Sequence, residues 1–459
     1  MAMGKRKKHR QQSLFVPTAR LPQSAAHPFY AKLNAVLAGW KFDAFVEDLC
    51  AKFYEENLGR PSLEPGKYFR LLLIGYFEGI DSERGIAWRC SDSLSLRAFV
   101  GYQLDELSTE HSTISRTRRL IDYDTHQQVF QWVLKVLADH DLINGKTVGV
   151  DATTLEANAA MRSIVRKDTK QNYSDFLTDL AKASGIETPT REELAKIDRK
   201  RKNKASNDDW ENPHDPDAKI AKMKDGSTHL AHKQEHAVDM DSGAVLAVTI
   251  QPADEGDTTT WRATVEETWQ NLGAVADAAE AGQVETEQLH PEPARELVAD
   301  KGYHSNQTMT DFAELGIRSY VSEPDRGRRD WQEKPAERDA VYANRRRIRG
   351  TRGKQLMRQR GELIERSFAH VLETGGMRRT HLRGRINILK RMLVHVGGFN
   401  LGLLMRKLVG IGKPRRLQGL FASIFDLILG LWTVVATICA EGTMVAGEET
   451  FSPSVCQPA

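Results

Sequence analysis

Hydrophobic residues follow two different patterns along the 459-residue chain, and the change comes about a third of the way in. Over residues 29–145 the apolar positions recur at helical spacing, as in Phe45, Leu49 and Phe53. Ser82 is a residue type that caps helices, and it precedes another short helical stretch. This part of the chain is therefore predicted to be mostly helical.

The remainder of the chain alternates short apolar runs with longer helical patterns. Two apolar runs joined by Asp241, Ser242 and Gly243 predict a β-hairpin. Around it the pattern predicts strands at 147–155, 296–300 and 317–321 and helices from 257, around 364–372 and at 389–408. Strands interleaved with helices in this order predict an α/β fold, in which a mixed sheet is flanked by helices.

Composition divides the chain into a basic arm at 1–28, a helical domain at 29–145, a sheet-containing domain at 146–410 and a hydrophobic tail at 411–459. A polar insert at about 161–227 is expected to be a helix pair or a partly disordered linker. The apolar run 420–440 is long enough to span a membrane. Asp426 interrupts it, so we expect a buried helix or a C-terminal segment prone to hydrophobic association there. We do not expect it to associate with a membrane.

Three carboxylates stand out because of where they lie. Asp151 and Asp300 each end an apolar strand, where a lone carboxylate is costly unless it is paired or bound to a metal ion. Glu365 lies at the edge of the apolar face of a predicted helix, whereas Glu362 points further toward water. Two strand-end aspartates and one helical glutamate can hold two Mg²⁺ or Mn²⁺ ions, the arrangement used to break and join phosphodiesters.

Basic residues are concentrated locally, although the net charge is only +3. Residues 326–360 hold thirteen Lys and Arg against four Asp and Glu, which predicts contact with DNA phosphates rather than a merely solvated face. A Ser/Thr-rich entry precedes a basic helix near 111–120, as in the second helix of a helix-turn-helix; a plain solvated helix is the alternative. The predicted DNA contacts are Arg116, Arg118, Arg119, Arg345, Arg346, Arg347, Arg349, Arg358, Arg378, Arg379 and Arg383.

Other site chemistries fit less well. The four cysteines are far apart and form no zinc or disulfide pattern. Residues 232–236 match H-x-x-E-H, but this zinc-peptidase pattern requires a helix and here leads into the hairpin. No phosphate-binding G-x-x-x-x-G-K-[ST] loop is present, which disfavours ATP use. Asp254 and Asp257 are alternative metal ligands, although Asp257 is more simply a helix cap.

The order of several short motifs resembles bacterial insertion-sequence DDE transposases, which have an RNase H-like catalytic domain. The resemblance covers roughly residues 30–410. It is carried by residues 148–153, 215–218 with 237–239, 299–303, 365–368 and 383–384, and by residues 111–116 in the helical, DNA-binding part.

The resemblance implies that Asp151, Asp300 and Glu365 are the metal-binding catalytic residues. It also implies binding to the inverted-repeat ends of an insertion sequence, endonuclease cleavage there, and transfer of the freed 3′-OH to target DNA by a homodimer or larger assembly in the cytoplasm, on the nucleoid. Related enzymes often carry a Tyr-x2-Arg-x3-Glu-x6-Lys signature, of which only the glutamate is present here. A non-catalytic DNA-binding protein and a plain metal-dependent nuclease are the alternative functions.

Overall fold

The computed structural model describes residues 27–55, 62–201, 206–223, 226–327 and 329–414. The basic arm, except for its last two residues, and the apolar run at 420–440 lie outside these ranges. Among the described residues, one helix, α14 (Arg385–Val409), is long and apolar enough to cross a membrane, and 89% of its apolar window is buried inside the protein.

The N-terminal third is helical, as its apolar spacing predicts. It comprises α1 (Pro28–Gly39), α2 (Phe42–Cys50), α3 (Pro65–Glu78), α4 (Glu83–Asp92), α5 (Leu94–Val100), α6 (His111–Leu120) and α7 (Tyr123–Asp139), with a short 3-10 turn, η2 (Ala51–Phe53), after α2. Ser82 caps α4 by accepting the Gly85 N–H. The expected Ser/Thr cap of the basic helix is wrong, because α6 begins after Glu110 with no side-chain cap.

A six-stranded mixed sheet forms the centre of the second part. Its strands are β1 (Thr147–Glu156), β4 (Lys219–Lys222), β5 (Thr228–Asp239), β6 (Val245–Pro252), β7 (Glu296–Ala299) and β8 (Arg318–Val321). β5 pairs antiparallel with β1, β4 and β6, whereas β7 runs parallel to both β1 and β8. The predicted α/β class, with a mixed sheet flanked by helices and a helical N-terminal region, is confirmed.

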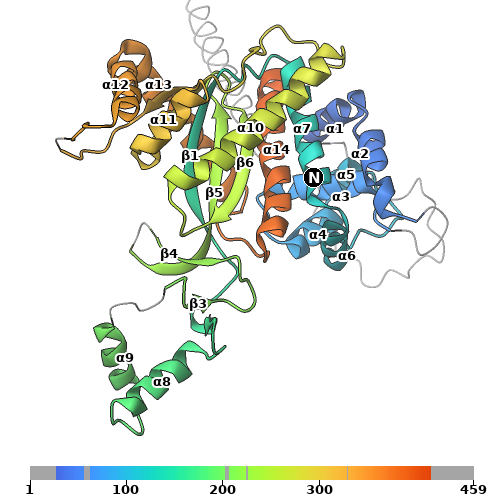
Figure 1. Cartoon of the computed structure of the whole chain (residues 1–459). Helices are drawn as coiled ribbons and strands as arrows, with labels where there is room; N and C mark the ends of the chain where they lie inside the picture. The colour runs from blue at the N-terminus through green and yellow to red at the C-terminus, as the bar shows by residue number, and fades with distance from the viewer. Residues whose placement is uncertain (1–26, 56–61, 202–205, 224–225, 328, 415–459) are drawn as a thin grey trace, which may run out of the picture.

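Helices cover both faces of this sheet. α10 (Asp257–Glu280) packs on one face against β5 and β6, and α13 (Thr351–Phe368) packs on the other against β1, β7 and β5 (Figure 1). α11 (Asn306–Glu314) and α12 (Pro335–Arg349) lie together at the β8 side, and a π-helical turn at Ala369–Glu373 (η5) follows α13.

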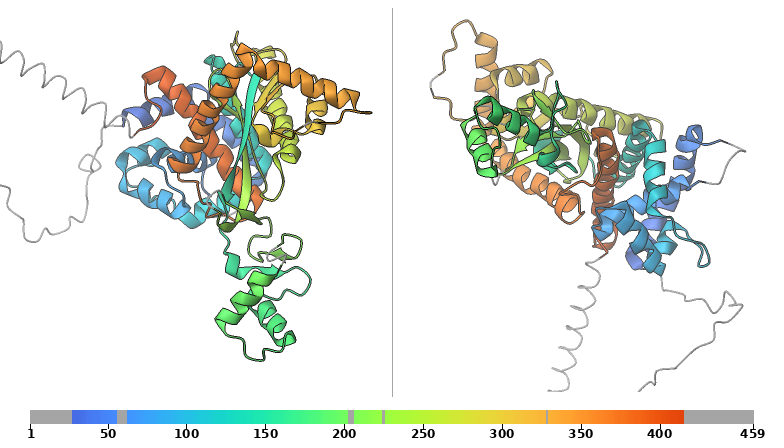
Figure 2. Two further views of the ribbon diagram at one scale, coloured as in Figure 1. Left: turned by 90° about the vertical axis from the view of Figure 1, so that its left-hand side faces the viewer. Right: turned by 90° about the horizontal axis from the view of Figure 1, so that it is seen from below.

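The insert after β1 is a small projecting lobe. It holds a 3-10 turn, η3 (Met161–Ser163), a helix pair, α8 (Tyr173–Ala183) and α9 (Arg191–Lys200), and a two-stranded sheet, β2 (Val165–Arg166) with β3 (Trp210–Glu211). Figures 1 and 2 show that the helix pair stands away from the main sheet. Trp210 is buried at its base among apolar residues, so the lobe has a minor core of its own.

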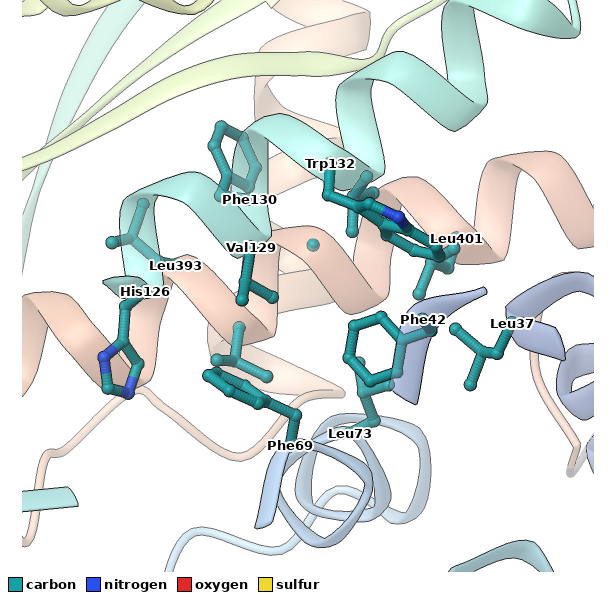
Figure 3. Close-up of a pocket in the computed structure, with 13 residues that line it drawn as sticks. Leu37, Phe42, Phe69, Leu73, His126, Val129, Phe130, Trp132, Leu393 and Leu401 are labelled. Carbon is teal, nitrogen blue, oxygen red and sulfur yellow. The ribbon is translucent and has the colours of Figure 1, made fainter. Parts of the chain in front are cut away.

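The helical part and the sheet share one hydrophobic core because α14 packs against both. Asn400 on α14 hydrogen-bonds both backbone groups of Val245 on β6, and Lys390 donates to the carbonyls of Arg118 and Ile121 at the end of α6. Apolar side chains of α2, α3, α7 and α14 point toward one another around a small pocket there (Figure 3). This pocket is a packing gap in the core and not a candidate site.

Candidate active site

Strand register brings the two predicted aspartates together. β1 and β7 pair in parallel with Thr147 opposite Glu296 and Gly149 opposite Val298. Continued for two more residues, this register sets Asp151 beside Asp300 at the edge where β7 ends. Their sequence separation of 149 residues is therefore the offset of the strand pair, which the sequence alone could not reveal.

The Asp151 carboxylate is partly buried and held by two donors. Its Oδ2 accepts from Nη1 of Arg360 at 2.7 Å, and its Oδ1 accepts from the Ala152 N–H at 2.8 Å. Burial raises the pKa of Asp151, the Arg360 guanidinium lowers it in part, and the negative charge of Asp300 raises it further. The negative charges of Asp151 and Asp300 thus interact, and Arg360 partly neutralises Asp151.

Asp300 begins a tight turn, and the next residues of this turn have little free space around them. Its Oδ1 accepts the Gly302 N–H at 2.7 Å and so caps the 3-10 turn η4 (Lys301–Tyr303). A Cβ added to Gly302 would lie 2.3 Å from Oδ2 of Asp257 and 3.0 Å from Oδ1 of Asp300, so a larger residue here would displace the Asp257 carboxylate. Asp257 is not the cap of α10, whose capping residue is Gly256, but forms an ion pair with Lys233 at 2.5 Å.

Glu365 is exposed on α13, and its neighbours show which way it points. Ile364 faces β1, since its Cδ1 would lie 3.0 Å from a Cβ at Gly149. Leu363 faces the β5–β6 turn, where its Cδ2 would lie 3.2 Å from a Cβ at Gly243. Because successive helical residues are about 100° apart, Glu365 occupies the flank of α13 opposite Leu363.

These carboxylates have oxygen chemistry that suits a divalent cation, and the mutual repulsion of Asp151 and Asp300 is what such an ion would relieve. Within the described ranges, however, no group of three or more His, Cys, Asp or Glu side chains is arranged to hold a metal ion. Arg360, which the sequence reasoning missed, occupies one oxygen of Asp151 instead. Its position one helical turn before Ile364 is the signal that could have identified it.

The predicted DNA-contacting arginines fall into two groups. Arg116, Arg119, Arg346, Arg349, Arg358, Arg378, Arg379 and Arg383 are exposed, although Arg378 pairs with Glu373 and Arg379 with Glu156. Arg118 is buried against Glu83, and Arg345 and Arg347 bond to Glu323 and Ser319. Arg118 was predicted to contact DNA but is an interior residue, and these last three arginines chiefly hold elements of the fold together.

Comparison with known families agrees with this geometry. Residues 18–120 match the family described as Transposase domain (DUF772), and residues 207–401 match the family described as Transposase DDE domain. The chain is a DDE transposase of the insertion-sequence type. Searches of curated proteins and of solved structures gave no match.

The two matches place the transposase features on the structure. The DDE match includes Asp300 and Glu365 and begins after Asp151, while the N-terminal match ends with α6. An RNase H-like fold for the sheet domain agrees with the DDE match and with the mixed sheet. DDE transposases generally use divalent metal ions and act on DNA, which fits the carboxylate pair and the exposed arginines of this transposase.

Proposed function

We propose that this transposase binds the inverted-repeat ends of its insertion sequence, cleaves them, and joins the freed 3′-OH ends to target DNA. The observation that carries the proposal is the β1–β7 register, which sets Asp151 beside Asp300 with α13 across from them. Asp151, Asp300 and Glu365 are the proposed catalytic residues, and Mg²⁺ or Mn²⁺, as two ions, the proposed cofactor.

In the first proposed step, water attacks the phosphorus at the transposon end. The bond from phosphorus to the 3′ oxygen breaks. One product end carries a 3′-OH, whose oxygen has taken up a proton, and the other product end carries a 5′-phosphate. In the second step that 3′-OH attacks a target phosphodiester, a new bond to phosphorus forms, and the target's own 3′-OH leaves. Bound metal ions would lower the pKa of the attacking oxygen and stabilise the leaving oxygen.

The residues of the chain have separate tasks in this proposal. Asp151 and Asp300, on adjacent strands, supply short and rigid ligands, and Glu365 reaches from the helix with a longer side chain. Arg360 forms an ion pair with Asp151 and partly neutralises it. The exposed arginines, Arg346, Arg349 and Arg358 on α12 and α13 among them, are proposed to contact the DNA backbone of ends and target.

The test is cleavage of a labelled duplex that contains the terminal repeat flanking the gene, with purified full-length protein and Mg²⁺. We expect nicks at the repeat boundary, lost by on the order of a thousandfold or more in Asp300→Asn and Glu365→Gln. Glu362→Gln is the matched control, because Glu362 is exposed on the same helix and forms an ion pair with Arg366. Equal loss in Glu362→Gln would contradict the assignment of Glu365.

Further outcomes separate the alternatives. Repeat binding without cleavage by the wild type would indicate a non-catalytic DNA-binding protein. Cleavage without end joining, when a target plasmid is added, would indicate a plain nuclease. Sedimentation of the protein with repeat DNA tests the proposed homodimer in the cytoplasmic, nucleoid-associated synaptic complex.

A further inference from the structure

Strand β5 carries polar side chains that the proposed chemistry does not use. Residues 232–236, His-Lys-Gln-Glu-His, lie in this strand, where successive side chains point to opposite faces of the sheet. Lys233 and Glu235 therefore face α10, whereas Gln234 and His236 face α13. All five are buried, so the strand carries a run of polar groups through the core.

Glu235 is bonded to the turn that follows Asp300. Its Oε1 accepts from the Tyr303 hydroxyl at 2.6 Å and from the Thr260 hydroxyl at 3.1 Å, and its Oε2 accepts from Thr264. Glu235 has no exposed surface and Tyr303 has none. Tyr303 is three residues after Asp300 in the same tight turn, so its hydroxyl fixes that turn against the sheet.

His236 makes the equivalent connection on the opposite face. It lies directly across from Asp151 in the β1–β5 register. Its Nδ1 is 2.9 Å from Oγ of Ser367, and its ring stacks on Phe368 with centroids 4.3 Å apart. Ser367 and Phe368 are two and three residues beyond Glu365, so His236 fixes the rotation of the last turn of α13.

We propose that Glu235 and His236 are positioning residues that hold Asp300 and Glu365, respectively, in place for metal binding. Asp151 lies on β1, which pairs with β5. Strand β5 is therefore in register with Asp151, and its side chains hold the turn that carries Asp300 and the helix that carries Glu365. Stability alone does not require this placement, because a buried carboxylate is costly and apolar residues would fill the space. The inference rests on the metal-binding role proposed for the three carboxylates.

The first variant is Tyr303→Phe, which removes only the hydroxyl and leaves Glu235 bonded to two threonines. The matched control is Tyr123→Phe, because the Tyr123 hydroxyl donates a hydrogen bond to Oε1 of Gln127 at 3.3 Å beside the partly buried carboxylate Glu267, but lies in the helical part. Both variants lose one hydrogen bond of a tyrosine hydroxyl, so a general loss of stability should be similar in the two.

Metal affinity is measured directly, by titrating Mn²⁺ into the full-length protein and following the free ion by electron paramagnetic resonance. We expect Tyr303→Phe to weaken Mn²⁺ binding by roughly tenfold, within the range seen when groups behind metal ligands are removed. Tyr123→Phe should bind Mn²⁺ as the wild type does. Equal Mn²⁺ affinity in Tyr303→Phe and the wild type would overturn the role of Glu235.

Cleavage provides an independent comparison. In Tyr303→Phe the Mg²⁺ concentration for half-maximal cleavage should rise several-fold, while the rate at saturating Mg²⁺ and the DNA affinity in EDTA stay near wild type. Glu235→Gln, which still accepts from Tyr303, should be milder than Glu235→Leu. If both substitutions act equally, the hydrogen bond to Tyr303 is not what matters.

Ser367→Ala tests the second half of the proposal, since it removes the oxygen that His236 contacts and leaves Glu365 unchanged. We expect the same weakening of Mn²⁺ binding, and unchanged binding would overturn the role of His236.

Asp300→Asn separates this inference from the proposed function. If Asp300→Asn binds Mn²⁺ as the wild type does, the metal-binding proposal and this inference both fail; if only Asp300→Asn loses Mn²⁺, the inference alone fails.

Discussion

Replacing His236 with glutamine should make the folded protein less sensitive to mild acid. The His236 imidazole has no exposed surface, and its burial lowers its pKa from 6.5 to about 3. The unfolded chain takes up a proton on this ring as the pH falls below 6.5, but the folded protein does not until about pH 3. Stability is therefore lost progressively across this window, as in any group whose pKa is depressed by folding.

The magnitude follows from the distance between the working pH and the unfolded pKa. At pH 5.0, 1.5 units below 6.5, His236 should cost about 2 kcal/mol of folding free energy, and at pH 7.5 almost nothing. Glutamine cannot take up this proton, so His236→Gln should lose about 2 kcal/mol less than the wild type between the two pH values. Any packing defect is present at both pH values and cancels in the difference.

The assay is urea denaturation at pH 7.5 and pH 5.0, with the free energy of unfolding compared between wild type and variant. The other buried histidines of the described residues, His126, His232, His304 and His395, are present in both proteins and cancel as well. His214→Gln, at an exposed position, is the control and should leave the pH dependence unchanged. An identical loss in His236→Gln and the wild type would refute the argument that burial keeps His236 neutral.

Three further predictions concern the candidate active site and the basic surface. Gly302→Ala places a methyl group between two carboxylates and should destabilise the protein by about 1–3 kcal/mol while reducing Mg²⁺-dependent cleavage; a wild-type melting temperature together with wild-type cleavage would contradict this. Arg360→Gln removes the cation beside Asp151 and so raises the pKa of that carboxyl, which should move the acid limb of the cleavage pH profile to higher pH; an unmoved limb counts against the contact. Arg346→Ala should reduce the salt dependence of DNA binding by about one phosphate contact, whereas Arg347→Ala should mainly lower stability, as measured by salt-titrated anisotropy and melting.

The spacing of apolar residues along the sequence was sufficient to predict the helices and strands named below. Apolar spacing located the helices of the N-terminal third, and the Asp-Ser-Gly turn located the β5–β6 hairpin. The same periodicity placed Asp300 directly after a strand, as found. The prediction that Asp151 ends a strand is wrong, because β1 continues along β5 to Glu156 and Asp151 lies in its middle. Such patterns depend only on neighbours within a few residues, and for that reason they can be read from one chain.

The sequence could not predict the hydrogen-bond and ion-pair partners of individual side chains, because these depend on strand register and packing between distant segments. The excess of arginine in residues 326–360 predicted a phosphate-binding surface, yet Arg345, Arg347, Arg352 and Arg360 bond to residues between 22 and 209 positions away. A local count of charge cannot reveal compensation supplied by another strand. The exposed arginines that remain, such as Arg346 and Arg349, form a narrower candidate surface than the count implied.

The H-x-x-E-H run shows how a structural context changes the chemistry of the same residues. On a helix, His232 and His236 would share a face one turn apart and could bind one zinc ion. In strand β5 they are four residues apart in an extended chain, roughly 13 Å by the usual rise, and Glu235 points to the opposite face. One bonds to Asp215 near the insert and the other to Ser367 beside Glu365. The run therefore ties the insert base, the Asp300 turn and the Glu365 helix to a single strand, and a displacement of β5 would move all three at once.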